Sequence, residues 1–218
     1  IAPEKAFLKN EAWYAEKGIE LLTGRSVLRV DFKRRVATLD DGKELSYKKM
    51  LIAVGGKTRA WRMPGAEHPD VLHLQTYDDA VSLRDRLAAG MRMAIVGSGF
   101  IGIEFAALCV EKGIRATVIN RGPHFWTSAL GEKIAAAVQA ALEAKGIDVR
   151  NNAKVASIVH AGTSTSVRLS QGEEIACDVV GVGIGVEVPT EPFGDLRGEY
   201  GLLGNAFLKT KHENVWVA

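Results

Sequence analysis

The stretch MAIVGSGFIGIEFAALCVEK, residues 93–112, decides the fold of this chain. Residues 93–96 form an apolar run that is typical of a buried strand, and residues 100–112 have the pattern of an apolar helix. The turn between them matches G-x-G-x-x-G over residues 97–102, and a second apolar run, 116–119, ends about twenty residues later. A glycine-rich turn between strand, helix and strand predicts a dinucleotide-binding fold.

Each glycine of the turn has a predicted task. We expect Gly97 to make the tight turn out of the strand and Gly99 to let backbone N–H groups approach a pyrophosphate. Gly102 would let the helix pack closely on the sheet. The helix N-terminus adds partial positive charge for the diphosphate. The predicted cofactor-binding turn is completed by Ser98, Phe100 and Ile101.

The second strand ends in Asn120 and Arg121, where such folds usually carry an acidic residue for the ribose hydroxyls. An asparagine can form a hydrogen bond with a hydroxyl group but has no charge. The guanidinium of Arg121 could approach a 2′-phosphate, or it could be a solvated surface charge. The sequence therefore leaves both NADH and NADPH open.

The pattern around the turn predicts a doubly wound α/β unit. Strands and helices alternate from residue 93 to 149, and antiparallel strands and a last strand at 179–183 follow. We place the boundaries of this unit near residues 88 and 195. Before it we expect helices at 11–17 and 76–87, short strands between residues 26 and 47, and a strand at 49–54 that is buried on both faces.

Composition narrows the class of protein. The chain has 218 residues with 47% hydrophobic and 25% charged side chains, as in an ordinary soluble domain. Its net charge of +2 gives no case for nucleic acid or an acidic membrane surface. Cys109 and Cys177 are expected to be reduced, buried thiols, and the five histidines are scattered, so we predict no metal site and a cytoplasmic location.

Residues 96–106 resemble the NAD fingerprint of the FAD-dependent pyridine nucleotide-disulphide oxidoreductases, in particular the ferredoxin and rubredoxin reductase-like branch. The resemblance implies that Glu104 lies near the nicotinamide. The run 180–183 is similar to the family's G-V-G segment beside the nicotinamide, which implies the same neighbourhood for Gly181 and Gly183.

Residues 51–59 resemble the family's A-T-G-x-x-P-R stretch, with valine at 54 and threonine at 58 in place of the usual residues. This resemblance implies that Ala53, Gly55 and Gly56 pass the flavin. The segment at residues 3–5 resembles the part that reaches toward the flavin, which adds Lys5 to the predicted cofactor contacts.

The resemblance also implies a Rossmann-type NAD(P) domain inserted in part of an FAD-binding domain. Residues 1–87 would be the middle portion of the FAD domain, 88–195 the NAD(P) domain, and 196–218 the return to the FAD domain. The family's first G-x-G-x-x-G would precede Ile1, and residues 214–218 are similar to the strand before the family's flavin-binding Gly-Asp. We therefore expect a fragment that does not itself retain FAD.

In the intact enzyme the resemblance implies hydride transfer from NAD(P)H to FAD, and electron transfer onward to a ferredoxin- or rubredoxin-type protein or to a disulfide. Cofactors carry this chemistry, so no catalytic side chain is predicted and the fragment alone is expected to be inactive. Two alternatives stay open: a non-catalytic NAD(P)-binding module, and a Rossmann-shaped interaction domain without a ligand.

Overall fold

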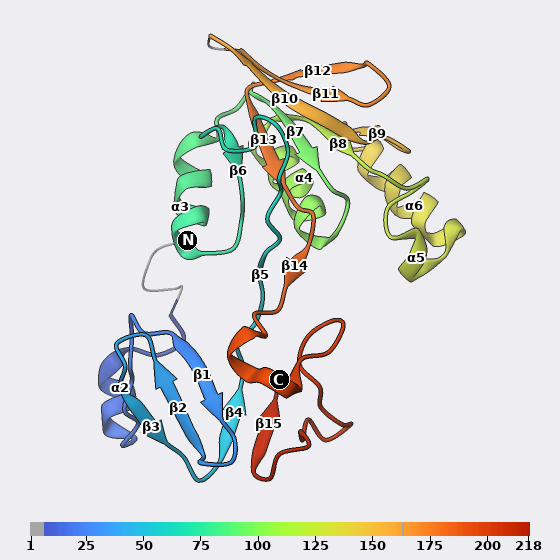
Figure 1. Ribbon diagram of the computed structural model, residues 1–218. Coiled ribbons are helices and arrows are strands. Elements are labelled where there is room, and N and C mark those ends of the chain that lie inside the picture. Colours follow the sequence, from blue (N-terminus) through green and yellow to red (C-terminus); the bar gives the residue numbers. More distant parts are fainter. Residues whose placement is uncertain (1–6, 163) are drawn as a thin grey trace. The chain divides into compact units, whose positions relative to one another are not determined.

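The computed structural model describes residues 7–162 and 164–218, and the chain divides into two compact units (Figure 1). We call Thr58–Val186 the central unit, and Ile1–Lys57 together with Glu187–Ala218 the flanking unit. The chain passes between them through β5 (Lys57–Thr58) and β14 (Val186–Glu187), which pair with each other. Within the described residues, no helix is both long and apolar enough to cross a membrane.

A five-stranded parallel sheet forms the middle of the central unit, in the order β6-β13-β7-β8-β9. Val96 lies opposite both Ile119 and Val182 in the register, so three neighbouring strands end at the same edge of the sheet. The strands are β6 (Val71–Leu72), β7 (Arg92–Val96), β8 (Arg115–Ile119), β9 (Asp148–Arg150) and β13 (Val179–Val182).

Alternating side chains of β7 point into two separate cores. Met93 and Ile95 pack in a cluster with Phe105 and Cys109 of α4, whereas Ala94 and Val96 belong to a second cluster. That second cluster is covered by an antiparallel sheet of β10 (Val155–Ala161), β11 (Ser164–Leu169) and β12 (Glu174–Cys177). The apolar run of β7 therefore reflects burial on both faces, as expected for a parallel sheet.

Two helix ends in the central unit, the start of α3 and the end of α4, have a clear physical cause. Thr76 accepts a hydrogen bond from the N–H of Asp79, and the Asp79 carboxylate accepts one from the N–H of Thr76, a capping box. Gly113 ends α4 in the left-handed conformation, with φ +66°. The helices are α3 (Tyr77–Arg86), α4 (Phe100–Lys112), α5 (Thr127–Leu130) and α6 (Glu132–Glu143).

The flanking unit has a small core of its own. Its three-stranded antiparallel sheet consists of β1 (Val27–Asp31), β2 (Val36–Leu39) and β3 (Glu44–Ser46), and α2 (Glu11–Glu16) precedes it. A parallel pair of β4 (Met50–Ile52) and β15 (Val215–Val217), with a 3-10 helix (Glu191–Leu196), supplies the rest of the unit. The core residues are Val30, Ala37, Ile52, Phe193, Leu196, Val215 and Val217.

The structure differs from two expectations, which concern the burial of the strand at residues 49–54 and the boundaries of the two units. Within the described residues, β4 pairs with β15 alone, and Leu51 is 63% exposed while Ile52 is buried, so this part of the chain does not itself bury the strand at residues 49–54 on both faces. The compact units also divide earlier than the expected boundaries near residues 88 and 195. At the first boundary the reason is that β6 pairs with β13, and Leu83 and Leu87 pack in the α4 cluster. The assignment of the domains to FAD and NAD(P) stays a prediction.

Replacing Gly102 with alanine should destabilise the protein. The new Cβ would lie 2.0 Å from the carbonyl oxygen of Gly97, and neither backbone can give way easily. We expect a loss of about 1–3 kcal/mol in the free energy of unfolding, larger than the gain from the better helix propensity of alanine. Urea denaturation measures this loss. The control is Ala107→Ser on the exposed side of the same helix, and an equal loss in both variants would contradict the prediction.

Candidate functional site

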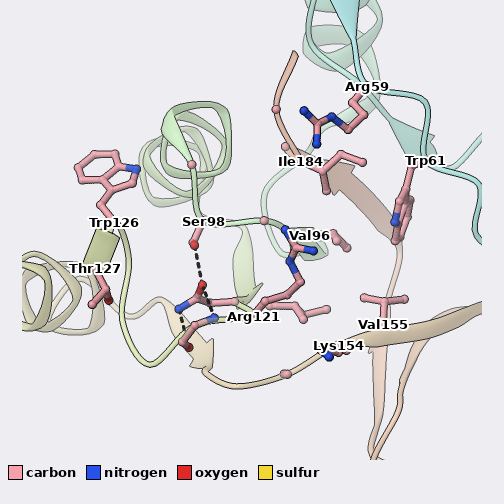
Figure 2. Close-up of a pocket in the computed structure, with 18 of the residues that line it drawn as sticks. Arg59, Trp61, Val96, Ser98, Arg121, Trp126, Thr127, Lys154, Val155 and Ile184 are labelled. Atoms are coloured by element: carbon pink, nitrogen blue, oxygen red, sulfur yellow. Dashed lines mark hydrogen bonds between the residues drawn. The ribbon is translucent and has the colours of Figure 1, made fainter. Parts of the chain in front are cut away.

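A pocket of about 970 Å³ lies where β7, β8 and β13 end, and the central unit alone forms it (Figure 2). This is the edge at which a doubly wound sheet binds ligands. Six of the predicted site residues line it, in three loops that are far apart in the sequence. They are Gly97, Ser98 and Gly99 after β7, Asn120 and Arg121 after β8, and Gly183 after β13.

Three glycine backbones interlock at the head of the pocket. Gly97 has φ +102°, and a Cβ there would lie 2.3 Å from the carbonyl oxygen of Gly183. A Cβ at Gly183 would in turn lie 2.8 Å from the backbone nitrogen of Gly102. These three positions are therefore required to be glycine by the protein itself, with or without a ligand.

Gly99 differs from its neighbours. An added Cβ would meet no atom closer than 3.9 Å, and its φ of −75° suits any residue. The first hydrogen bond of α4 runs from the N–H of Ile103 to the carbonyl of Gly99, so the N–H groups of the preceding turn have no carbonyl within the helix. Open space beside free donors at a helix N-terminus fits the pyrophosphate of a dinucleotide.

Asn120 is only 4% exposed and uses its amide fully within the protein. Its Oδ1 accepts hydrogen bonds from Ser98 Oγ (2.7 Å) and from the N–H of Gly122 (3.2 Å). Its Nδ2 donates to the Gly122 carbonyl (3.0 Å) and to Asn151 Oδ1 (2.8 Å). The side chain holds three loops together, and it has no donor or acceptor left for a ribose hydroxyl.

Only cations supply full charges to the pocket lining. Arg59, Arg121 and Lys154 line it, all three are exposed, and no aspartate or glutamate is among the lining residues (Figure 2). Together with the N-terminus of α4, these side chains make the pocket attractive to an anion.

An aromatic pair stands beside the glycine turn. Phe100, on the first turn of α4, is 79% exposed, and its ring centroid lies 4.9 Å from that of Trp126. Trp126 lines the pocket, and its indole N–H is buried without a hydrogen-bond partner among the described residues. The neighbouring Phe125 is fully buried in the α4 cluster.

Other predicted site residues do not line this pocket. Gly181 faces α4, since a Cβ there would lie 2.3 Å from Met93 Cε and 3.3 Å from the Phe105 ring. Glu104 is exposed on α4. The cofactor roles of Gly181 and Glu104 stay predictions. The same holds for the other predicted site residues outside the pocket. Phe100, Ile101 and Gly102 begin α4, Ala53, Gly55 and Gly56 belong to the flanking unit, and Lys5 lies outside the described residues.

Sequence reasoning missed the side walls of the pocket. Arg59, Trp61 and Met63 come from the loop before β6, and Lys154 and Val155 follow β9. The rule that ligands bind at the carboxyl ends of parallel strands could have indicated the residues after β9. In the loop before β6, Arg59 ends the stretch that resembles the family's A-T-G-x-x-P-R, whereas Trp61 and Met63 carry no such signal, because they reach the pocket only through tertiary packing.

We expected the five histidines to be scattered, but two of them lie together. The rings of His68 and His160 stack with centroids 3.6 Å apart, and both lie near Asp70. His160 makes contacts with the Gly65 carbonyl (3.2 Å) and Thr165 Oγ1 (3.1 Å), while Asp70 accepts a hydrogen bond from Arg86 (2.5 Å). The nitrogen atoms of His160 and one oxygen of Asp70 thus already have protein partners.

Three comparisons relate the chain to known proteins. The profile of the pyridine nucleotide-disulphide oxidoreductase family matches residues 2–218. Rubredoxin-NAD(+) reductase of Ectopseudomonas oleovorans is 34% identical over 196 residues, which is 88% of this chain and 51% of that protein. The ferredoxin--NAD(+) reductase subunit of the benzene 1,2-dioxygenase system of Pseudomonas putida is 31% identical over 180 residues, 83% of this chain and 44% of that subunit.

The crystal structure of the ferredoxin reductase for the CYP199A2 system from Rhodopseudomonas palustris superposes with a TM-score of 0.90 at 27% identity. The superposition covers 99% of this chain and 54% of that one. These findings confirm the resemblance and the α/β fold class that the sequence predicts. The chain spans about half the length of the curated relatives it matches.

Replacing Gly99 with valine should abolish dinucleotide binding and leave the fold intact. A Cβ at this position would meet no atom closer than 3.9 Å, and the branched side chain would occupy the space beside the N–H groups at the start of α4. Calorimetric titration with NADH and NADPH measures binding, and thermal melting measures stability. Ala107→Val, on the exposed side of the same helix, is the control that should keep its affinity. Unchanged affinity of Gly99→Val would place the pyrophosphate elsewhere.

Neither cysteine should react with a thiol reagent in the folded protein at pH 7. Cys109 and Cys177 are free and buried, and burial raises the pKa of each thiol to about 11. The reactive thiolate is therefore nearly absent at neutral pH. A colorimetric thiol assay should detect both cysteines only after denaturation. Rapid labelling of the native protein would contradict this prediction.

Proposed function

Because this chain belongs to the pyridine nucleotide-disulphide oxidoreductase family, we propose that its central unit binds NAD(P)H for an FAD-dependent oxidoreductase. The observation that carries the proposal is the turn at Gly99. There, the N–H groups of the first turn of α4 have no helical carbonyl to bind, and a Cβ added at Gly99 would meet open space at the head of a large cationic pocket. A turn that only built the fold would need Gly97, Gly102 and Gly183, but would have no use for an open position at Gly99.

In this proposal the chain binds and orients NAD(P)H, and the coenzyme supplies the hydride. The N-terminus of α4 holds the pyrophosphate, and the loop after β8 faces the adenosine half. The loop after β13, with Gly183 and Gly185, faces the nicotinamide half.

We place the flavin contacts in the flanking unit, on the loop after β4. Ala53 and Gly55 are exposed there, and Gly55 has φ +60° with no atom within 4 Å of an added Cβ. A backbone without a side chain at this point allows the close approach of a planar cofactor. When bound, FAD accepts a hydride and passes on single electrons.

We propose that the intact protein delivers electrons to a ferredoxin- or rubredoxin-type protein. The relatives named above are reductases of such proteins. Cys109 and Cys177 are free and buried, so neither forms part of a redox-active disulfide in the described residues. A disulfide elsewhere in the intact protein stays the alternative acceptor. Free thiols also suit a reducing compartment, so we propose the cytoplasm.

Coenzyme binding should be visible in tryptophan fluorescence. Trp61 and Trp126 line the pocket, and reduced nicotinamide absorbs tryptophan emission, so NADH or NADPH should quench it in a saturable way. Trp13 and Trp216 belong to the flanking unit and report other changes. The double variant Trp61→Phe/Trp126→Phe should lose most of the quenching but keep calorimetric binding. No saturable binding of either coenzyme at millimolar concentration would overturn the proposal.

A further inference from the structure

The loop after β8 does not have the chemistry that selects NADH. Selection of NADH usually rests on a carboxylate that accepts hydrogen bonds from the ribose hydroxyls and repels a 2′-phosphate. The equivalent place, at the end of β8, holds Asn120, a neutral side chain whose hydrogen-bonding capacity is filled by Ser98, Gly122 and Asn151. Asn120 therefore neither recognises a free 2′-hydroxyl nor rejects a phosphate.

The neighbouring charges are positive. Arg121 follows Asn120 directly and is exposed, and Lys154 reaches the same pocket from the loop after β9. These two loops are tied together, because the N–H of Ala153 donates to the Asn120 carbonyl (2.9 Å) and the N–H of Asn152 to the Gly122 carbonyl (2.9 Å). The two cations thus stand on loops that are fixed to each other at the end of β8.

No ion pair engages these two cations in the described part of the chain, and no carboxylate lines the pocket. Most other arginines of the central unit, such as Arg86, Arg92 and Arg150, are paired with aspartate or glutamate. An unpaired arginine is planar and can donate two parallel hydrogen bonds to a phosphate.

We infer that the pocket prefers NADPH to NADH, with Arg121 and Lys154 binding the 2′-phosphate. The inference rests on the proposed coenzyme function and adds to it the identity of the coenzyme. The extra phosphate carries about −1.5 to −2 charges at pH 7, which the two cations offset and no lining carboxylate opposes.

The test is calorimetric titration of the protein with NADPH, NADH and adenosine 2′,5′-bisphosphate. We expect NADPH to bind about tenfold more tightly than NADH or better, the range of a charge-assisted hydrogen bond. Arg121→Ala should weaken NADPH and the bisphosphate by about the same factor and leave NADH nearly unchanged. Arg121→Glu should reverse the preference. Because Arg121 and Lys154 are exposed, added salt should reduce the preference for NADPH.

Arg59→Ala is the matched control, since Arg59 lines the same pocket but comes from the loop before β6. It should weaken both coenzymes by similar factors and leave their ratio unchanged. Equal or tighter binding of NADH by the unaltered protein would overturn the inference and leave the proposed function standing. A preference for NADPH that survives both Arg121→Ala and Lys154→Ala would overturn the assigned residues. Failure of both coenzymes to bind would overturn the proposed function itself.

Discussion

The close approach of three glycine backbones is the constraint on which the central unit depends. Gly97, Gly102 and Gly183 leave no room for a Cβ, and each clash would be with the backbone of another member of the group. This contact brings the start of α4 against the ends of β7 and β13, and it is reinforced by the hydrogen bond from the Gly183 N–H to the Val96 carbonyl (2.8 Å). The helix N-terminus is thereby aimed at the edge of the sheet where the pocket lies.

Packing on both faces of β7 holds this arrangement in place. Its odd-numbered residues, Met93 and Ile95, join the α4 core, and its even-numbered residues, Ala94 and Val96, join the core under the antiparallel sheet. Gly181 on β13 also helps to hold this arrangement. Phe105 and Met93 can pack against it only because it has no side chain. A residue expected beside the nicotinamide thus has a structural task that the sequence pattern does not distinguish from a binding task.

Local patterns predicted most of the fold. The helix at residues 100–112 and the strands β7, β8, β9 and β13 follow from apolar periodicity and from glycines at their ends, which are local signals, whereas β6 lies in a stretch without such a pattern. The neighbours of the strand at 49–54 could not be predicted, because an apolar run does not reveal which strands flank it; among the described residues it pairs with β15 alone. The same limit applies to the site: Gly99 and Arg121 stood in a recognisable motif, whereas the placement of Trp61 in the pocket and the stacking of His68 on His160 arise only from tertiary contacts.

The neutrality of Asn120 links the architecture of the pocket to its charge. The loops around this side chain present two donors, Ser98 Oγ and the Gly122 N–H, and two acceptors, the Gly122 carbonyl and Asn151 Oδ1. An amide satisfies all four of these groups. An ionised aspartate could only accept hydrogen bonds, so its oxygen atoms would face the oxygen atoms of the Gly122 carbonyl and of Asn151 without a hydrogen between them. A carboxylate at this buried position would therefore weaken the loops that shape the pocket. Selection of the coenzyme must then pass to residues that are not part of this network, and the exposed cations beside it are free to take that role.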